Sequence, residues 1–259
     1  TANITPDMPV LVAGQFHARL SDGVMDPVTA TILALESGGG DNAEKTIWIS
    51  CDLVGISDGM RTTANLRDEI RNRVIKAIPA IRPEQIIVNA THTHAAPYVA
   101  STAAVEDIYG VSLEQMADGK PAMSPADYIP FAAGKIADGV INAWENRKPG
   151  GMSLGLGHAV VGLNRLQALK HGKSRMYGNT NSTEFSHIEG HEDHSLNLMY
   201  FWDINKQLTG VIINIASPSQ VSEHSYKLSA DFWHDTKEAL RKSLGESVYV
   251  LAQASAAGD

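Results

Sequence analysis

Short apolar runs alternate along most of the chain with longer segments in which apolar residues recur every three or four positions. The short runs are rich in β-branched residues and predict strands at 10–13, 28–35, 46–51, 85–90, 196–202, 211–215 and 248–252. The longer segments predict helices at 58–78, 125–144 and 230–244. Strand, helix and strand follow one another in 46–90, and a helix precedes the last strand. The pattern therefore predicts an α/β fold of mixed sheets with crossover helices.

Two stretches depart from this alternation. Residues 167–193 are mostly polar and are interrupted by glycine and asparagine, which predicts a long loop excursion. The run 248–252 is followed at once by small residues, where the sequence stops. Because a strand and a small-residue loop usually lead to another element, we expect a single domain over 1–259 that is truncated at its C-terminal end.

Composition and charge exclude two classes of protein. The 259 residues include 21 Lys and Arg against 29 Asp and Glu, a net charge of −8 without a basic stripe, which excludes a nucleic-acid-binding protein. The apolar runs are far shorter than the roughly 20 residues of a membrane-spanning helix, which excludes a transmembrane protein. The one cysteine, Cys51, rules out a multi-cysteine zinc site and is expected to be a buried, unreactive thiol.

His92 and His94 carry the most informative pattern for chemistry, in the sequence Thr-His-Thr-His-Ala-Ala-Pro directly after the strand predicted at 85–90. Alternate residues of a strand point the same way, so both imidazoles are expected at its C-terminal end, where α/β sheets bind ligands. Two imidazoles on one side suit a zinc ion. The alternative is a polar strand end whose histidines hydrogen-bond to nearby backbone carbonyls.

Three other candidates are less specific. Residues 187–194 hold three histidines and three carboxylates, but a solvated acidic loop is the favoured interpretation because Gly190 argues against a helix. His224 follows a predicted strand and has Glu223 beside it, so it is a plausible site residue. Arg165 follows a strand-like run and is either an anion clamp or one half of a surface ion pair.

Motifs in order along nearly the whole chain make it resemble the neutral/alkaline (non-lysosomal) ceramidases. The central one is the Thr-His-Thr-His segment, and Asn164-Arg165 falls where that family carries its Asn-Arg. The other similar segments are 4–6, 13–19, 23–27, 50–53, 229–231 and 252–259.

The resemblance implies a zinc-dependent hydrolase of an N-acyl amide, with either a lipid or a small-molecule substrate. It implies that His92 binds the catalytic Zn²⁺, that His94 lies beside the metal-bound water, and that Arg165 belongs to the same site. Bound zinc would lower the pKa of its water and polarise the substrate carbonyl. Through the family alone, we expect a secreted or periplasmic protein.

Departures from the family pattern leave other interpretations open. Ser217 stands where the family has its second metal-binding histidine, and we expect either that His224 or another residue replaces that ligand or that the metal site is altered. The remaining acidic and tyrosine ligands would lie in a downstream C-terminal segment of the same protein, which is thus an expected partner. The alternatives are a ceramidase-fold binding or scaffold domain that has lost catalysis, and a metal hydrolase with another substrate.

Overall fold

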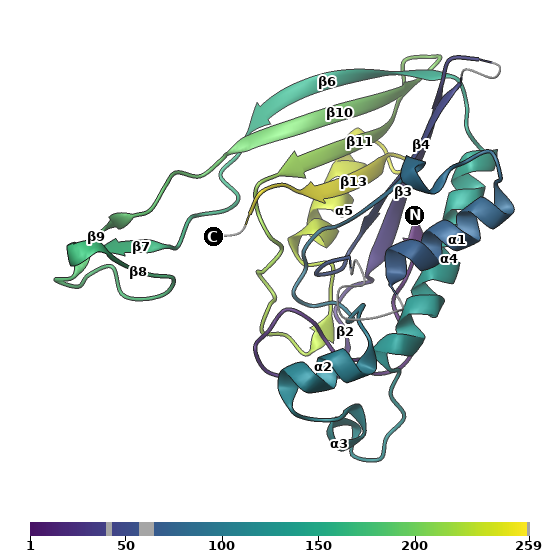
Figure 1. The fold of residues 1–259 in the computed structure, drawn as a ribbon. Coiled ribbons are helices and arrows are strands. Elements are labelled where there is room, and N and C mark those ends of the chain that lie inside the picture. Colours follow the sequence, from purple (N-terminus) through teal and green to yellow (C-terminus); the bar gives the residue numbers. More distant parts are fainter. Residues whose placement is uncertain (40–42, 57–64, 258–259) are drawn as a thin grey trace.

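The framework of the computed structural model, which describes residues 1–39, 43–56 and 65–257, is two four-stranded sheets (Figure 1). The first has the order β1-β3-β4-β5 and consists of β1 (Ala2–Asn3), β3 (Thr29–Ser37), β4 (Glu44–Cys51) and β5 (Ile86–Ala90). The second has the order β13-β11-β10-β6 and consists of β13 (Tyr249–Ala254), β11 (Leu208–Ile215), β10 (Ser195–Asp203) and β6 (Gly150–His158).

Both sheets are mixed. In the first, only β4 and β5 run parallel, and the chain between them contains α1 (Leu66–Ala77). In the second, only β11 and β13 run parallel, and they are joined through α5 (Phe232–Leu244). A parallel pair needs such a crossover because its second strand must start again at the same end of the sheet. The predicted α/β fold with crossover helices is confirmed.

The main core lies between the first sheet and two helices. Strand β4 presents Ile47 and Ile49, which are fully buried, to α1 and to α4 (Pro125–Glu145). Helix α4 is capped by Ser124, whose hydroxyl accepts from the Asp127 amide, and it approaches β3 so closely that a Cβ atom at Gly139 would lie 2.5 Å from Ile32. On the second sheet, Trp233 of α5 packs with buried residues of β11 and β13.

The two sheets are joined where β13 lies against β3, β4 and β5. The hydroxyl of Ser50 and the side-chain amide of Asn89 both donate to the backbone carbonyl of Ala252. Trp48 of the first sheet and Ile212 of the second line one open hollow of about 320 Å³. These contacts hold the end of β5 at a fixed place relative to the second sheet.

Shorter elements complete the fold. Helices α2 (Thr102–Tyr109) and α3 (Leu113–Ala117) lie between β5 and α4, and β2 (Gly23–Val24) pairs in parallel with β12 (Lys227–Leu228). In the part of the chain that the structure describes, short 3₁₀ helices occur at Pro83–Gln85 and Lys170–Gly172. None of the helices in the described ranges is both long and apolar enough to cross a membrane.

Three local expectations need correction. Residues 10–13 are not a strand, because residues 10, 11 and 12 form isolated bridges to three different parts of the chain, at Met123, Leu20 and Pro97. Residues 167–193 are not only loop, since they form the sheet β8-β7-β9 from β7 (Gln167–Leu169), β8 (Lys173–Arg175) and β9 (Phe185–Ile188), away from the main sheets (Figure 1). Strand β6 was not predicted, because glycines interrupt its apolar positions. Helix α1 begins at Leu66, and positions 58–64 of the predicted helix lie outside the described residues.

Candidate functional site

His92 and His94 follow the edge of the first sheet at which β4 and β5 both end. Strands β4 and β5 pair in parallel, and their last paired residues are Cys51 and Ala90. One more backbone hydrogen bond follows, from the Thr91 amide to the Cys51 carbonyl (2.9 Å). His92 then takes a left-handed backbone conformation, with φ of 62°. A residue with a Cβ atom rarely adopts this conformation, and it ends the strand geometry. The alternation expected from a continuing strand is therefore not what brings the two rings together.

The two imidazoles face each other through their Nε2 atoms, which are 3.2 Å apart. The ring centroids are 4.9 Å apart and the planes are inclined by 69°. On the far side of the His92 ring, Nδ1 lies 2.6 Å from the carbonyl oxygen of Val54. Because a carbonyl only accepts, Nδ1 of His92 is the protonated nitrogen of the neutral ring and its Nε2 carries the lone pair.

The His94 ring is enclosed on several sides. Gly14, with φ of 103°, approaches so closely that a Cβ atom there would lie 2.5 Å from Cγ of His94. The Gln220 amide nitrogen lies 3.2 Å from Nδ1 and 3.1 Å from Nε2, and a Glu223 carboxylate oxygen lies 3.7 Å from Nδ1. Burial lowers the pKa of His94, as does the neighbouring His92, so the neutral imidazole is favoured.

The backbone at Ser219 lies beside the two histidines, and it places the next residue, Gln220, against the His94 ring. The His94 amide donates to the Ser219 carbonyl (3.1 Å), and the Ser219 amide donates to the His92 carbonyl (3.3 Å). The Ser219 hydroxyl also donates to the carbonyl of Thr91 (2.8 Å). The backbone of 91–94 is thus held by the loop after β11 as well as by its own strand.

Two buried charged residues fix the loop 220–225. Arg19 donates to the carbonyls of Glu223 and Ser225 (2.6 Å each), and also to those of His94 (2.7 Å) and Ala13 (2.6 Å). From the other side, the Asp231 carboxylate accepts from the backbone amides of residues 221 and 222 while it caps α5. Asp231 does so at φ of 58° and ψ of −151°, a strained backbone for a non-glycine residue.

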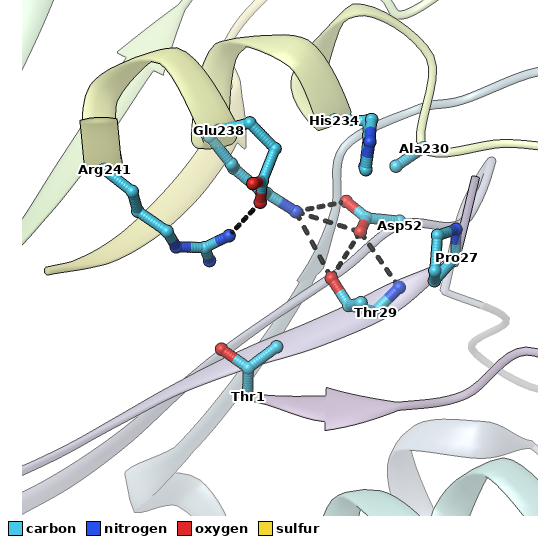
Figure 2. Close-up of a pocket in the computed structure, with 9 residues that line it drawn as sticks. Thr1, Pro27, Thr29, Asp52, Ala230, His234, Glu238 and Arg241 are labelled. Carbon is cyan, nitrogen blue, oxygen red and sulfur yellow. Dashed lines mark hydrogen bonds and ion pairs between the residues drawn. The ribbon is translucent and has the colours of Figure 1, made fainter. Parts of the chain in front are cut away.

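Asp52 and Lys237 form a buried ion pair, and Figure 2 shows Asp52 among the residues that line the hollow beside it. Their side chains are 1% and 7% exposed, and Nζ of Lys237 lies 2.9 Å from both carboxylate oxygens. Asp52 also accepts from the Thr29 amide and hydroxyl, and from the Thr91 hydroxyl at 3.4 Å. The pair lines a hollow of about 130 Å³ against α5, and it ties that helix to the ends of both site strands.

Ser217 is buried, two residues before Ser219, whose backbone bonds to the histidine segment. Its hydroxyl donates to the carbonyl of Pro218 (3.2 Å), and Gly162 packs so closely against it that a Cβ atom there would lie 3.2 Å from the Ser217 oxygen. Cys51, as expected, is fully buried, and burial raises the pKa of its thiol above the ordinary range.

The other residues singled out in the sequence lie on separate segments of the chain. His224 has an 83% exposed side chain, and its Nε2 is 3.6 Å from the second oxygen of Glu223. Arg165 is half-buried and stacks over the ring of Tyr177, with 5.1 Å from guanidinium carbon to ring centroid. In 187–194, Glu192 accepts from the Asn164 amide, as expected of a loop carboxylate that binds backbone.

The described residues supply two candidate ligands of the metal site expected from the resemblance, but not a third. Nitrogens bound to one tetrahedral zinc at about 2.0–2.1 Å are about 3.3–3.4 Å apart, close to the 3.2 Å between the two Nε2 atoms. A catalytic zinc needs three protein ligands, and within the described ranges no three His, Cys, Asp or Glu side chains are grouped to hold one. The pair therefore fits as two ligands and not as a whole site.

Sequence reasoning missed Gln220, Arg19 and Asp231 as parts of this centre. Arg19 and Asp231 lie in segments similar to the ceramidases, but nothing in their spacing shows that they contact the same loop. A signal did exist for Asp231, which stands at the predicted start of a helix, the usual place of a capping carboxylate.

No protein-family model and no curated protein matches the sequence. Among solved structures, the chain is similar to neutral ceramidase from Pseudomonas aeruginosa, with a TM-score of 0.71 and 16% identity, over 99% of this chain and 38% of that one. It is also similar to a ceramidase complexed with C2, with a TM-score of 0.69 and 16% identity, over 97% of this chain and 36% of that one. At this identity the likeness shows the fold, which is that of the N-terminal portion of a neutral ceramidase.

Proposed function

We propose that the chain is the N-terminal part of a ceramidase-like zinc hydrolase that cleaves an N-acyl amide. The observation that carries the proposal is the pair His92 and His94, whose Nε2 atoms converge at the end of β5 on a fold shared with ceramidases along 97–99% of the chain. The ceramidases act on ceramide, an N-acyl lipid, so a lipid amide is the first substrate class to test and a small-molecule amide the second.

Each group has a task in this proposal. Bound zinc would lower the pKa of its water and polarise the substrate carbonyl. His92 holds the ion through Nε2, because Val54 fixes its ring in the correct tautomer. His94 belongs to the same centre and is kept neutral by burial. Arg165 is proposed to bind the oxyanion or acid group of the substrate through its planar guanidinium.

The chain spans less than two fifths of the ceramidase chains it resembles, so the remaining groups of the site are proposed to come from a downstream segment of the same protein. Secretion, or export to the periplasm, is proposed from the same likeness.

The test is hydrolysis of N-acyl-sphingosine and of a short N-acyl amide by the longest natural polypeptide that contains this chain. Activity should fall when a chelator removes the metal, return with added zinc, and be lost in His92→Ala. Turnover that is unchanged by the chelator and by His92→Ala would refute the proposal.

One observation favours a second candidate, a binding or scaffold domain without catalysis. Ser217 offers a hydroxyl where the family places an imidazole, and a hydroxyl is a much weaker zinc ligand. X-ray fluorescence of the purified protein separates the two candidates, because stoichiometric zinc is expected of the hydrolase and no zinc of the scaffold.

A further inference from the structure

The tautomer of His92 leaves a lone pair aimed at His94. Its Nδ1 donates to the Val54 carbonyl at 2.6 Å, so in the neutral ring Nε2 is unprotonated. That nitrogen lies 3.2 Å from Nε2 of His94.

The surroundings of His94 are compatible with the same tautomer. The Glu223 carboxylate, which only accepts, lies 3.7 Å from Nδ1, which is longer than a hydrogen bond but on the side of that nitrogen. The Gln220 amide is about equally far from both ring nitrogens, so it favours neither. With protons on both Nδ1 atoms, two lone pairs face each other across 3.2 Å, an arrangement that a shared cation stabilises.

The spacing matches one particular cation geometry. Two nitrogens bound to a tetrahedral zinc are about 3.3–3.4 Å apart, so the pair needs almost no movement to bind one ion. Ser217, by contrast, turns its hydroxyl to the carbonyl of Pro218 and packs against Gly162, so this position supplies no imidazole to the pair.

We propose that His94 supplies the second imidazole of the metal site in place of the one missing at Ser217, so that His92 and His94 bind a single zinc ion through their Nε2 atoms. This deepens the proposed function, on which it rests for the choice of zinc, and it gives His94 a role different from the water-side one that the resemblance implies. His224 is then not needed as a ligand, which agrees with its 83% exposed side chain.

The buried side chains of Arg19 and Asp231 hold the loop 220–225 in place beside the His94 ring. Arg19 binds the carbonyls of both His94 and Glu223, and Asp231 binds the amides just before Glu223. The carboxylate is therefore held beside the His94 ring by two buried side chains rather than by a mobile loop. A partner that accepts a hydrogen bond from a metal-binding imidazole typically changes metal affinity by about 10- to 100-fold when removed, and at 3.7 Å Glu223 is expected to have a smaller effect.

The experiment is a zinc titration by calorimetry, with the metal-free chain and variants of single histidines. His92→Ala and His94→Ala are each expected to lower zinc affinity at least about 10-fold, the low end for damage to a ligand network. His224→Ala and His158→Ala, which remove imidazoles outside the pair, are expected to keep the wild-type affinity within about twofold. Glu223→Gln should lie between the two groups.

Three outcomes would overturn the proposal: wild-type zinc affinity in His94→Ala, a larger loss in His224→Ala than in His94→Ala, or no zinc binding by the wild-type chain. Circular dichroism of the metal-free variants shows whether they fold, and His94→Gln, which keeps a polar side chain of similar size, replaces the alanine variant if it does not. Because the readout is binding, a protein that binds zinc through the pair but hydrolyses no amide refutes the proposed function alone.

Discussion

The guanidinium of Arg19 donates a hydrogen bond of 2.7 Å to the backbone carbonyl of His94. The same side chain binds the carbonyls of Ala13, Glu223 and Ser225, and the whole residue is 1% exposed. Three segments that are far apart in sequence therefore meet on one buried cation. The position of His94 depends on a residue that precedes it by 75 positions.

Replacing Arg19 should destabilise the protein strongly. Arg19→Ala removes the side-chain donor from one buried carbonyl, that of Ala13, and from three partly buried carbonyls. A buried acceptor left unsatisfied costs about 1–3 kcal/mol, so we expect the free energy of unfolding to fall by at least about 1–3 kcal/mol. Urea denaturation followed by circular dichroism measures it.

Arg82→Ala is the matched control, because Arg82 and its partner Glu84 are 64% and 65% exposed. An exposed pair of this kind contributes about 0–1 kcal/mol. Equal midpoints of unfolding for Arg19→Ala and Arg82→Ala would contradict the role given to Arg19.

The buried pair of Asp52 and Lys237 gives a second prediction. Lys237→Met leaves the Asp52 carboxylate buried without its cation, which is expected to lower the unfolding free energy by about 3–5 kcal/mol. The double variant Asp52→Asn with Lys237→Met removes both charges and should recover part of that loss. A double variant less stable than Lys237→Met would contradict the cost that we assign to the unpaired Asp52 carboxylate.

Stability should depend on pH through His94. Burial lowers its pKa in the folded state below the ordinary 6.5, so the unfolded chain takes up this proton first as the pH falls. The contribution of neutral His94 is thus fully present above about pH 6.5 and is lost as the pH falls toward the lowered folded-state pKa.

His94→Asn removes this titration. Urea denaturation from pH 8 to pH 5 should show a smaller loss of stability on acidification in His94→Asn than in the wild type. At pH 8 the imidazole is neutral in both states, so the difference between the two proteins there reports packing alone. Identical slopes below pH 6.5 would mean that the ring is protonated equally easily in the folded and unfolded chains.

Sequence periodicity predicted the elements that bury a regular apolar face. Strands β4 and β5, with α1 between them, and α4 with its Ser124 cap lie close to their predicted positions. Strand β6 was missed because its apolar residues face solvent and alternate with glycine, so it lacks the buried run by which the other strands were found.

The sequence predicted the two histidines of the site but not the residues that hold them in place. The Thr-His-Thr-His motif at the end of β5 located His92 and His94, although the left-handed backbone at His92 sets their relation. The contact of Arg19 with His94 joins residues 75 positions apart, that of Gln220 with His94 joins residues 126 positions apart, and that of Arg19 with Glu223 joins residues 204 positions apart. Such contacts follow from tertiary structure and leave no periodic signal.

Residues 1–259 by themselves should not hydrolyse amides, even with zinc supplied. A catalytic zinc needs three protein ligands and an open position for water, and the described residues group only the two imidazoles. An assay of the purified chain against N-acyl-sphingosine and a short N-acyl amide, with and without the downstream segment added in trans, tests this. Zinc-dependent turnover by the chain alone, abolished in His92→Ala, would show that the other ligands lie within these residues.

The central claim is that His92 and His94 converge on one metal ion. Anomalous diffraction at the zinc absorption edge, from crystals of the chain soaked in zinc, tests it most directly. The account predicts one strong peak within about 2.0–2.1 Å of Nε2 of both residues. A peak bound by His92 but not by His94, or zinc found at His224 in place of the pair, would contradict it.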